Sequence, residues 1–275
     1  MKNIMHLAYL GLLAAAPMLA SCEKDDTGSL EGPVPVGTFT TTSRTVGLTT
    51  EVTFTAAPND DAFLYQWEFG DGPGPNGTGS VASGRTATHA YTRGGTFKAQ
   101  LITAGRGGAG FSATQDVVIP STLNIVRQLL TNGSSRTWKL DNTVAAAIVV
   151  GPSDADPTSY YAGGPAGGLP ACQADDEFTF SAADVYSYDA KTQTLVAGTG
   201  GGCQAPRTGS TPFTFGAATG AGVGQLTLAN TGTFIGITDA PDLVYRIISI
   251  DDQRMVLRAG SSTASVVFTM KLAVK

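Results

Sequence analysis

The sequence predicts an all-β protein of two antiparallel domains with one short helix between them. Short apolar runs alternate with polar residues at a period of two, which is typical of strands with one buried face. Turn-forming residues separate these runs throughout the chain, which has 35 Gly and 14 Pro among 275 residues. The chain is too long for one small sandwich and has a comfortable length for two domains.

The first 21 residues have the pattern of a secretory signal peptide. Lys2 provides a positive start, an apolar stretch follows from Ile4 to Leu19, and small residues precede Cys22. The stretch is shorter than the roughly 20 residues of a membrane-spanning helix, and Pro17 interrupts it. Leu19-Ala20-Ser21-Cys22 resembles the lipobox of bacterial lipoproteins, which implies cleavage before Cys22 and lipidation of that residue.

Charged residues follow Cys22 directly. Glu23-Lys24-Asp25-Asp26 resembles the lipoprotein export signal of the Bacteroidetes. This resemblance implies a lipid anchor in the outer membrane and a protein that faces the cell exterior. The alternative is a solvated charge run in a flexible tether. Residues 22–33 are interpreted as the lipidated tether, since prolines and glycines are frequent after Asp26.

Residues 34–120 carry the most specific motif of the chain. It consists of Trp67-Glu68-Phe69-Gly70-Asp71-Gly72, then His89-Ala90-Tyr91 and Gly95-Thr96-Phe97. Trp67 and Phe69 are two residues apart, so they would face one side of a strand and form a core with Tyr91 and Phe97. The motif is similar to the WDFGDG signature of PKD domains, which usually have Asp at the position of Glu68. The resemblance implies an immunoglobulin-like sandwich that acts mostly as a spacer or weak binder.

A helical junction is predicted at residues 121–133. Ser121 can cap a helix from Thr122 to about Thr131, and Gly133 can end it. Strand patterns resume in residues 134–275. Eight or so consecutive strands predict either an antiparallel barrel or a β-sandwich.

Four short motifs in residues 134–275 favour the barrel. They are Trp138-Lys139-Leu140, Asp176-Glu177-Phe178-Thr179-Phe180, Tyr245-Arg246-Ile247 and Met255-Val256-Leu257-Arg258. Their order resembles that of lipocalin-like domains in secreted and surface proteins of the Bacteroidetes. Residues 142–175 and 189–211 are long and rich in Gly and Pro, which departs from a compact barrel. A jelly-roll-like sandwich is therefore the alternative.

Cys172 and Cys203 are the two cysteines after Cys22. Outside the cytoplasm, an isolated pair is most simply explained as one disulfide, and the alternative is two free buried thiols.

The residue types argue against an enzyme. His89 is the one histidine after the signal peptide and belongs to the first domain, so a Ser-His-Asp triad or a histidine metal site is excluded in the second. Glu177 follows Asp175 and Asp176, and these neighbours alternate faces rather than form an acid/base pair across a sugar. Asp154-Ala155-Asp156 is interpreted as turn chemistry rather than a calcium loop. We expect no cofactor and no metal, and the lack of a basic patch argues against nucleic-acid binding.

Binding is the remaining function. A lipid-anchored sandwich followed by a second β domain resembles the non-enzymatic lipoproteins that bind glycan beside outer-membrane import systems. This resemblance implies a polysaccharide or oligosaccharide ligand and an outer-membrane transporter complex as partner. Sugar rings stack on exposed aromatic rings, and the candidate ligand-binding residues are Tyr160, Tyr161, Tyr186, Tyr188 and Trp138. The alternatives are an adhesion or scaffold protein that binds other proteins, and a small-molecule carrier with a hollow barrel.

Overall fold

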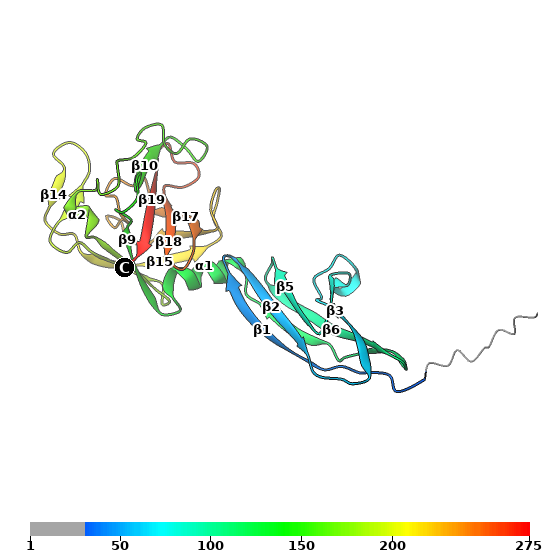
Figure 1. The fold of residues 1–275 in the computed structure, drawn as a ribbon. Helices are drawn as coiled ribbons and strands as arrows, with labels where there is room; N and C mark the ends of the chain where they lie inside the picture. Colours follow the sequence, from blue (N-terminus) through cyan, green and yellow to red (C-terminus); the bar gives the residue numbers. More distant parts are fainter. Residues whose placement is uncertain (1–30) are drawn as a thin grey trace, which may run out of the picture.

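The computed structural model describes residues 31–275 and has a β-sandwich and a β-barrel joined by the helix α1 (Figure 1). The predicted signal peptide, the predicted lipidation site Cys22 and most of the predicted tether lie outside the described residues. Between residues 31 and 275, no helix has the length and apolar character needed to cross a membrane.

The sandwich consists of two antiparallel sheets. The first sheet has the order β1-β2-β5 and contains β1 (Phe39–Val46), β2 (Thr49–Ala56) and β5 (Thr86–Tyr91). The second has the order β4-β3-β6-β7 and contains β4 (Val81–Ser83), β3 (Ala62–Glu68), β6 (Gly95–Gly105) and β7 (Gly108–Phe111). The strand β8 (Gln115–Ile119) pairs with the first half of β6, and the 3₁₀ turn η1 (Pro75–Gly77) lies between β3 and β4.

The predicted aromatic core of the sandwich is confirmed. Trp67, Phe69, Tyr91 and Phe97 are all buried in it. The polar atoms of the two largest rings also have partners, because Trp67 Nε1 donates to the carbonyl of Gly84 and Tyr91 Oη donates to the carbonyl of Phe69, both at 2.8 Å. These bonds connect the rings to the turns that follow β3 and β4.

Gly70 explains why the motif turns directly after Phe69. Its φ is +80°, and a Cβ at this position would lie 2.6 Å from the backbone of Lys98, so only glycine fits. The turn brings Asp71 to His89, whose Nε2 lies 2.7 Å from Asp71 Oδ2. The His89 ring stacks on Phe69 with centroids 4.2 Å apart. His89 is therefore packed into the sandwich.

The helix α1 (Thr122–Thr131) separates the two β units. The Oγ of Ser121 accepts a hydrogen bond from the backbone N–H of Asn124, and Asn132 ends the helix in the left-handed conformation. Val126 and Leu130 are fully buried and belong to the core of the barrel. The helix therefore covers one end of the barrel (Figure 1).

The second unit is an eight-stranded antiparallel barrel, which settles the choice between barrel and sandwich. Its strands follow one another along the chain: β9 (Ser135–Leu140), β11 (Glu177–Ser181), β12 (Val185–Asp189), β15 (Gly209–Gly216), β16 (Gly224–Leu228), β17 (Val244–Ile250), β18 (Arg254–Ala259) and β19 (Val267–Val274). The pairing of β19 with β9, for example Leu272 with Leu140, closes the sheet. Aromatic and aliphatic side chains fill the interior.

The two long segments, residues 142–175 and 189–211, form additional short elements outside the barrel wall. The strand β10 (Ile148–Gly151) pairs with the first half of β19, beyond the end of β9, and the short helix α2 (Ala171–Ala174) follows. The strands β13 (Thr194–Val196) and β14 (Gly202–Gln204) form a separate hairpin. Because the strands alternate in direction, the four long connections (residues 141–176, 190–208, 229–243 and 260–266) leave from the end of the barrel opposite α1. We call this the loop end.

Candidate ligand-binding site

The structure corrects three of the five predicted ligand-binding residues. Trp138, Tyr186 and Tyr188 are at most 4% exposed and lie inside the barrel. Their polar atoms are occupied as well: Trp138 Nε1 donates to the carbonyl of Leu130, and Tyr186 Oη donates to that of Phe234. Alternation along β12 does place both tyrosines on one face, but this is the core face. Tyr186 and Tyr188 do line a small pocket, but its volume of about 40 Å³ is too small for a sugar ring.

Tyr160 and Tyr161 are exposed, at 63% and 51%. Tyr161 forms an isolated antiparallel bridge with Val150 of β10, in which the two backbones exchange hydrogen bonds of 2.9 Å. Tyr161 lines a groove at the loop end, whereas Tyr160 does not.

The groove beside Tyr161 has a volume of about 240 Å³ and a largely apolar lining. Ile148 and Val150 of β10 lie on one side of their strand and pair in register with Met270 and Phe268 of β19. The remaining lining includes Gly164, Pro165, Leu169, Gln173, Leu195, Ile237, Asp239 and Phe268. Sequence reasoning missed these residues, because they come from three separate connections and from β19, which only the closed barrel brings together.

Covalent and hydrogen bonds hold the walls of the groove in place. The predicted disulfide between Cys172 and Cys203 is confirmed and joins α2 to β14. Next to it, the buried Gln173 donates from Nε2 to the carbonyl of Gly236 at 3.0 Å. The backbone N–H of Ala197 donates to Thr238 Oγ1 at 2.9 Å. Such fixed walls reduce the entropy that a ligand must remove on binding.

A second, more polar pocket of about 250 Å³ adjoins the groove. Its lining includes Arg207, Thr231, Thr233, Thr238 and Asp242. Along the segment 237–240, residues 237 and 239 line the apolar groove, whereas residues 238 and 240 line this pocket. The segment 237–240 thus forms a ridge between the two. Both Asp242 oxygens already accept backbone hydrogen bonds, from Val244 and Ser261.

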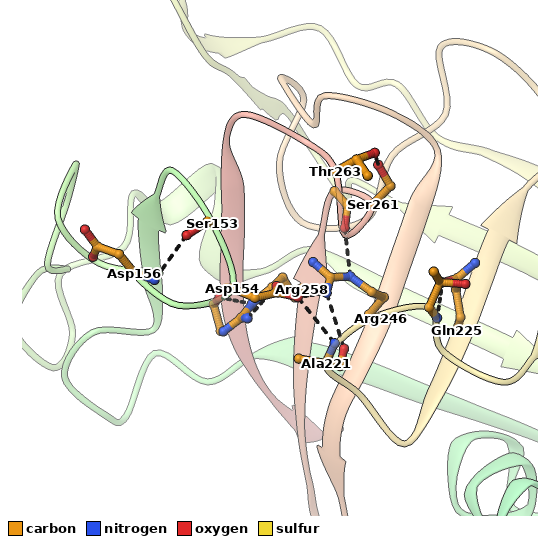
Figure 2. Close-up of polar contacts among 12 residues, drawn as sticks. Ser153, Asp154, Asp156, Ala221, Gln225, Arg246, Arg258, Ser261 and Thr263 are labelled. Atoms are coloured by element: carbon orange, nitrogen blue, oxygen red, sulfur yellow. Dashed lines mark hydrogen bonds and ion pairs between the residues drawn. The ribbon is translucent and has the colours of Figure 1, made fainter.

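Asp154 anchors the segment that carries the two exposed tyrosines. Its Oδ2 lies 2.5 Å from Arg246 Nη1, and its Oδ1 lies 2.8 Å from Arg258 Nη1 (Figure 2). The Arg246 side chain is fully buried on the outer wall of the barrel and also donates to the carbonyl of Gly260. The hydrogen bond from Arg246 is the main reason that the pKa of Asp154 lies well below its usual range. Asp154 is therefore an ion-pair partner, and no group of three or more His, Cys, Asp or Glu in residues 31–275 could hold a metal ion.

Asp176 is a second perturbed carboxyl near the loop end. It is 2% exposed, and burial raises its pKa to about 7. The hydroxyl of Tyr188 donates to its Oδ1 at 2.8 Å and opposes this shift. Asp176 is not among the residues that line the groove.

Comparison with known proteins identifies the sandwich. Residues 31–119 match the family model of the PKD domain. These residues form a PKD domain. The PKD1 domain of Vibrio anguillarum Epp is 26% identical, with 33% of this chain and 100% of that chain covered and a TM-score of 0.23. Another solved structure is described as the structural basis for the promiscuous specificity of carbohydrate-binding modules from the β-sandwich superfamily. It is 13% identical, with 89% of this chain and 92% of that chain covered and a TM-score of 0.28. No curated protein matches the sequence.

The PKD domain contributes no residue to the groove or to the polar pocket at the loop end. The described chain starts at the end of the PKD domain that lies far from the barrel (Figure 1). The order along the molecule is therefore N-terminus, PKD domain, α1 and barrel.

Proposed function

We propose that the protein is a non-enzymatic cell-surface lipoprotein that binds glycan at the loop end of its barrel. The observation that carries this proposal is the groove beside Tyr161, where an exposed aromatic ring stands over an apolar floor. The apolar face of a sugar ring stacks on such a surface, and its hydroxyls need polar partners nearby. Asp239 in the groove and Arg207 in the adjoining pocket offer such partners.

The arrangement of the chain supports a role in glycan capture at a membrane. A lipid on Cys22 would hold the N-terminus at the outer membrane, and the PKD domain would then separate the barrel from the membrane surface. In this arrangement, the loop end faces away from α1 and is free to meet a polysaccharide. A transporter complex in the same membrane would take up the captured glycan.

The topology also supports a lipocalin-like origin for the barrel. Eight antiparallel strands follow one another in an up-and-down order and close into a barrel. Here the interior is filled by side chains, so the ligand is expected at the mouth of the barrel rather than inside it.

Affinity electrophoresis with soluble polysaccharides tests the proposed site. The lipid-free chain of residues 23–275 should be retarded by at least one polymer, and Tyr161→Ala should weaken this retardation. Tyr160→Ala is the matched control, because Tyr160 is also an exposed tyrosine but lies outside the groove. Equal retardation of Tyr161→Ala and the wild type would place the site elsewhere.

The membrane anchor is tested separately in cells. Wild-type protein should fractionate with the outer membrane and be cleaved when protease is added to intact cells. Cys22→Ala should release the protein from the membrane fraction. A variant that stays bound to the membrane would contradict anchoring through a lipid on Cys22.

A further inference from the structure

We infer that the PKD domain carries a second glycan-binding site, which lies in a groove along its strand β3. This inference rests on the proposed function, because it names a second contact for the same polysaccharide. The groove has a volume of about 770 Å³, larger than either pocket at the loop end of the barrel. Residues of β3, β6 and the β4–β5 turn line it.

An incomplete sheet creates this groove. The strand β4 pairs only with Gln66–Glu68, so the first half of β3 has β6 as its one sheet partner within the described chain. A register irregularity between Ala62 and Leu64 further disturbs this half of β3. The chain after β4 turns away at Gly84, whose N–H donates to the carbonyl of Tyr65. The space that a longer β4 would occupy is therefore open.

The open half of β3 presents apolar side chains to solvent. Phe63 is 64% exposed and Leu64 is 61% exposed, and both line the groove. In the same groove, the guanidinium of Arg85 lies 5.9 Å from the ring centroid of Tyr65. Burial would stabilise a large aromatic side chain, and here the sequence places Phe63 in water instead. A ligand that covers the ring would recover this energy.

Polar side chains without a hydrogen-bond partner in the described residues surround these rings. Asp60, Gln66, Ser83 and Arg85 line the groove, and in residues 31–275 their side chains make no hydrogen bond or ion pair. Asp60 and Arg85 carry opposite charges, so the groove has no net charge from its lining. An exposed aromatic ring among free donors and acceptors matches the alternating apolar faces and hydroxyls of a neutral glycan chain.

Two sites on one chain predict avidity for long polymers. Once one site holds a polysaccharide, the other binds the same molecule at a high effective concentration, provided that the polymer spans both sites. A short oligosaccharide cannot span them and occupies each site independently. The two ligand lengths therefore distinguish one site from two.

The test uses residues 23–275, a panel of neutral soluble polysaccharides (dextran, laminarin, mannan and xylan) and short oligosaccharides cut from the polymer that retards the protein. Calorimetry should give two oligosaccharide sites for the wild type and one for Phe63→Ala. The same variant should lose about tenfold or more in apparent affinity for the polymer. Phe111→Ala is the control, because Phe111 is an exposed aromatic residue of the same sheet outside this groove.

Each outcome separates this inference from the proposed function. If Phe63→Ala keeps wild-type stoichiometry and polymer affinity while Tyr161→Ala loses binding, the site on the PKD domain is overturned and the barrel site stands. If only Phe63→Ala loses binding, the barrel site is overturned. Restored binding in Phe63→Tyr would show that the aromatic ring, rather than the fold, accounts for the loss. If none of the polymers retards the wild type, both sites are overturned.

Discussion

Replacement of Asp154 by Ala tests how the segment that carries Tyr161 is held on the barrel. One carboxylate accepts hydrogen bonds from two guanidinium groups, and the side chain of Arg246 has no solvent exposure. The substitution leaves Arg246 with the carbonyls of Gly260 and Ala221, and Arg258 with the hydroxyl of Thr269. Neither arginine then has a negative partner in this cluster.

The burial of the cluster determines how much stability Asp154→Ala should lose. Removal of one partner from a buried ion pair costs about 3–5 kcal/mol, because it leaves a charge without compensation. Asp154 is 25% exposed, so we expect the lower end of this range, about 3 kcal/mol. Domains unfold with a total free energy of about 5–15 kcal/mol, so the loss would be a large share of the barrel's stability.

Two further variants distinguish the effect of an unpaired buried charge from the effect of losing a single hydrogen bond. Arg258→Gln leaves Arg246 and Asp154 as a balanced pair, so its cost should be only about 1 kcal/mol. Asp156→Ala is the control in the same exposed loop, where the carboxylate accepts one backbone hydrogen bond from Ser159. Its cost should stay below about 1 kcal/mol.

Urea unfolding followed by tryptophan fluorescence measures these losses, since Trp67 reports on the PKD domain and Trp138 on the barrel. The barrel transition should move in Asp154→Ala. The lowered pKa of Asp154 means that its stabilisation is present above the unfolded pKa of about 3.9 and is lost as pH falls further. The difference from wild type should therefore persist between pH 5 and 8. A loss of stability below about 1 kcal/mol, or one equal to that of Asp156→Ala, would show that the two arginines do not depend on Asp154.

Two other predictions concern the loop end. Cys172→Ser/Cys203→Ser removes a disulfide with a sequence separation of 31, so calorimetry should show a free energy of unfolding lower by about 3–4 kcal/mol and a Tm lower by about 10 °C; an unchanged Tm would contradict this. Burial raises the pKa of Asp176 to about 7, so its stabilising effect is complete below the unfolded pKa of about 3.9 and is lost as pH rises through 7. Asp176→Asn should therefore unfold at higher urea than wild type at pH 8 but not at pH 4, and a difference that does not change with pH would refute this assignment.

The sequence predicted what depends on local pattern and on a specific motif. Trp67 and Phe69 lie two residues apart in a strand next to a turn, so their shared core face follows from strand geometry alone. The disulfide followed from the number of cysteines and the expected compartment. The barrel was one of two alternatives, because the contact that closes it joins β9 to β19, more than a hundred residues later.

The site was harder to predict for the same reason. Alternation shows that Tyr186 and Tyr188 share a face but does not say whether that face is inside the barrel. Likewise, nothing near Asp154 in the sequence points to Arg246 or Arg258, which follow about a hundred residues later on neighbouring strands. The sequence therefore indicated only turn chemistry at Asp154. Only long-range pairing of the strands decides which aromatic rings reach a ligand and which charges pair.

Chemical-shift mapping of the tyrosine rings shows directly whether a glycan binds beside Tyr161. In a protein with ¹³C-labelled tyrosine, saturating amounts of the glycan that retards the chain should shift the ring signals of Tyr161. The signals of Tyr160, which lies outside the groove, and of the buried Tyr186 should stay in place. Shifts at Tyr160 without shifts at Tyr161, or shifts confined to the PKD domain, would contradict a glycan site at the loop end of the barrel.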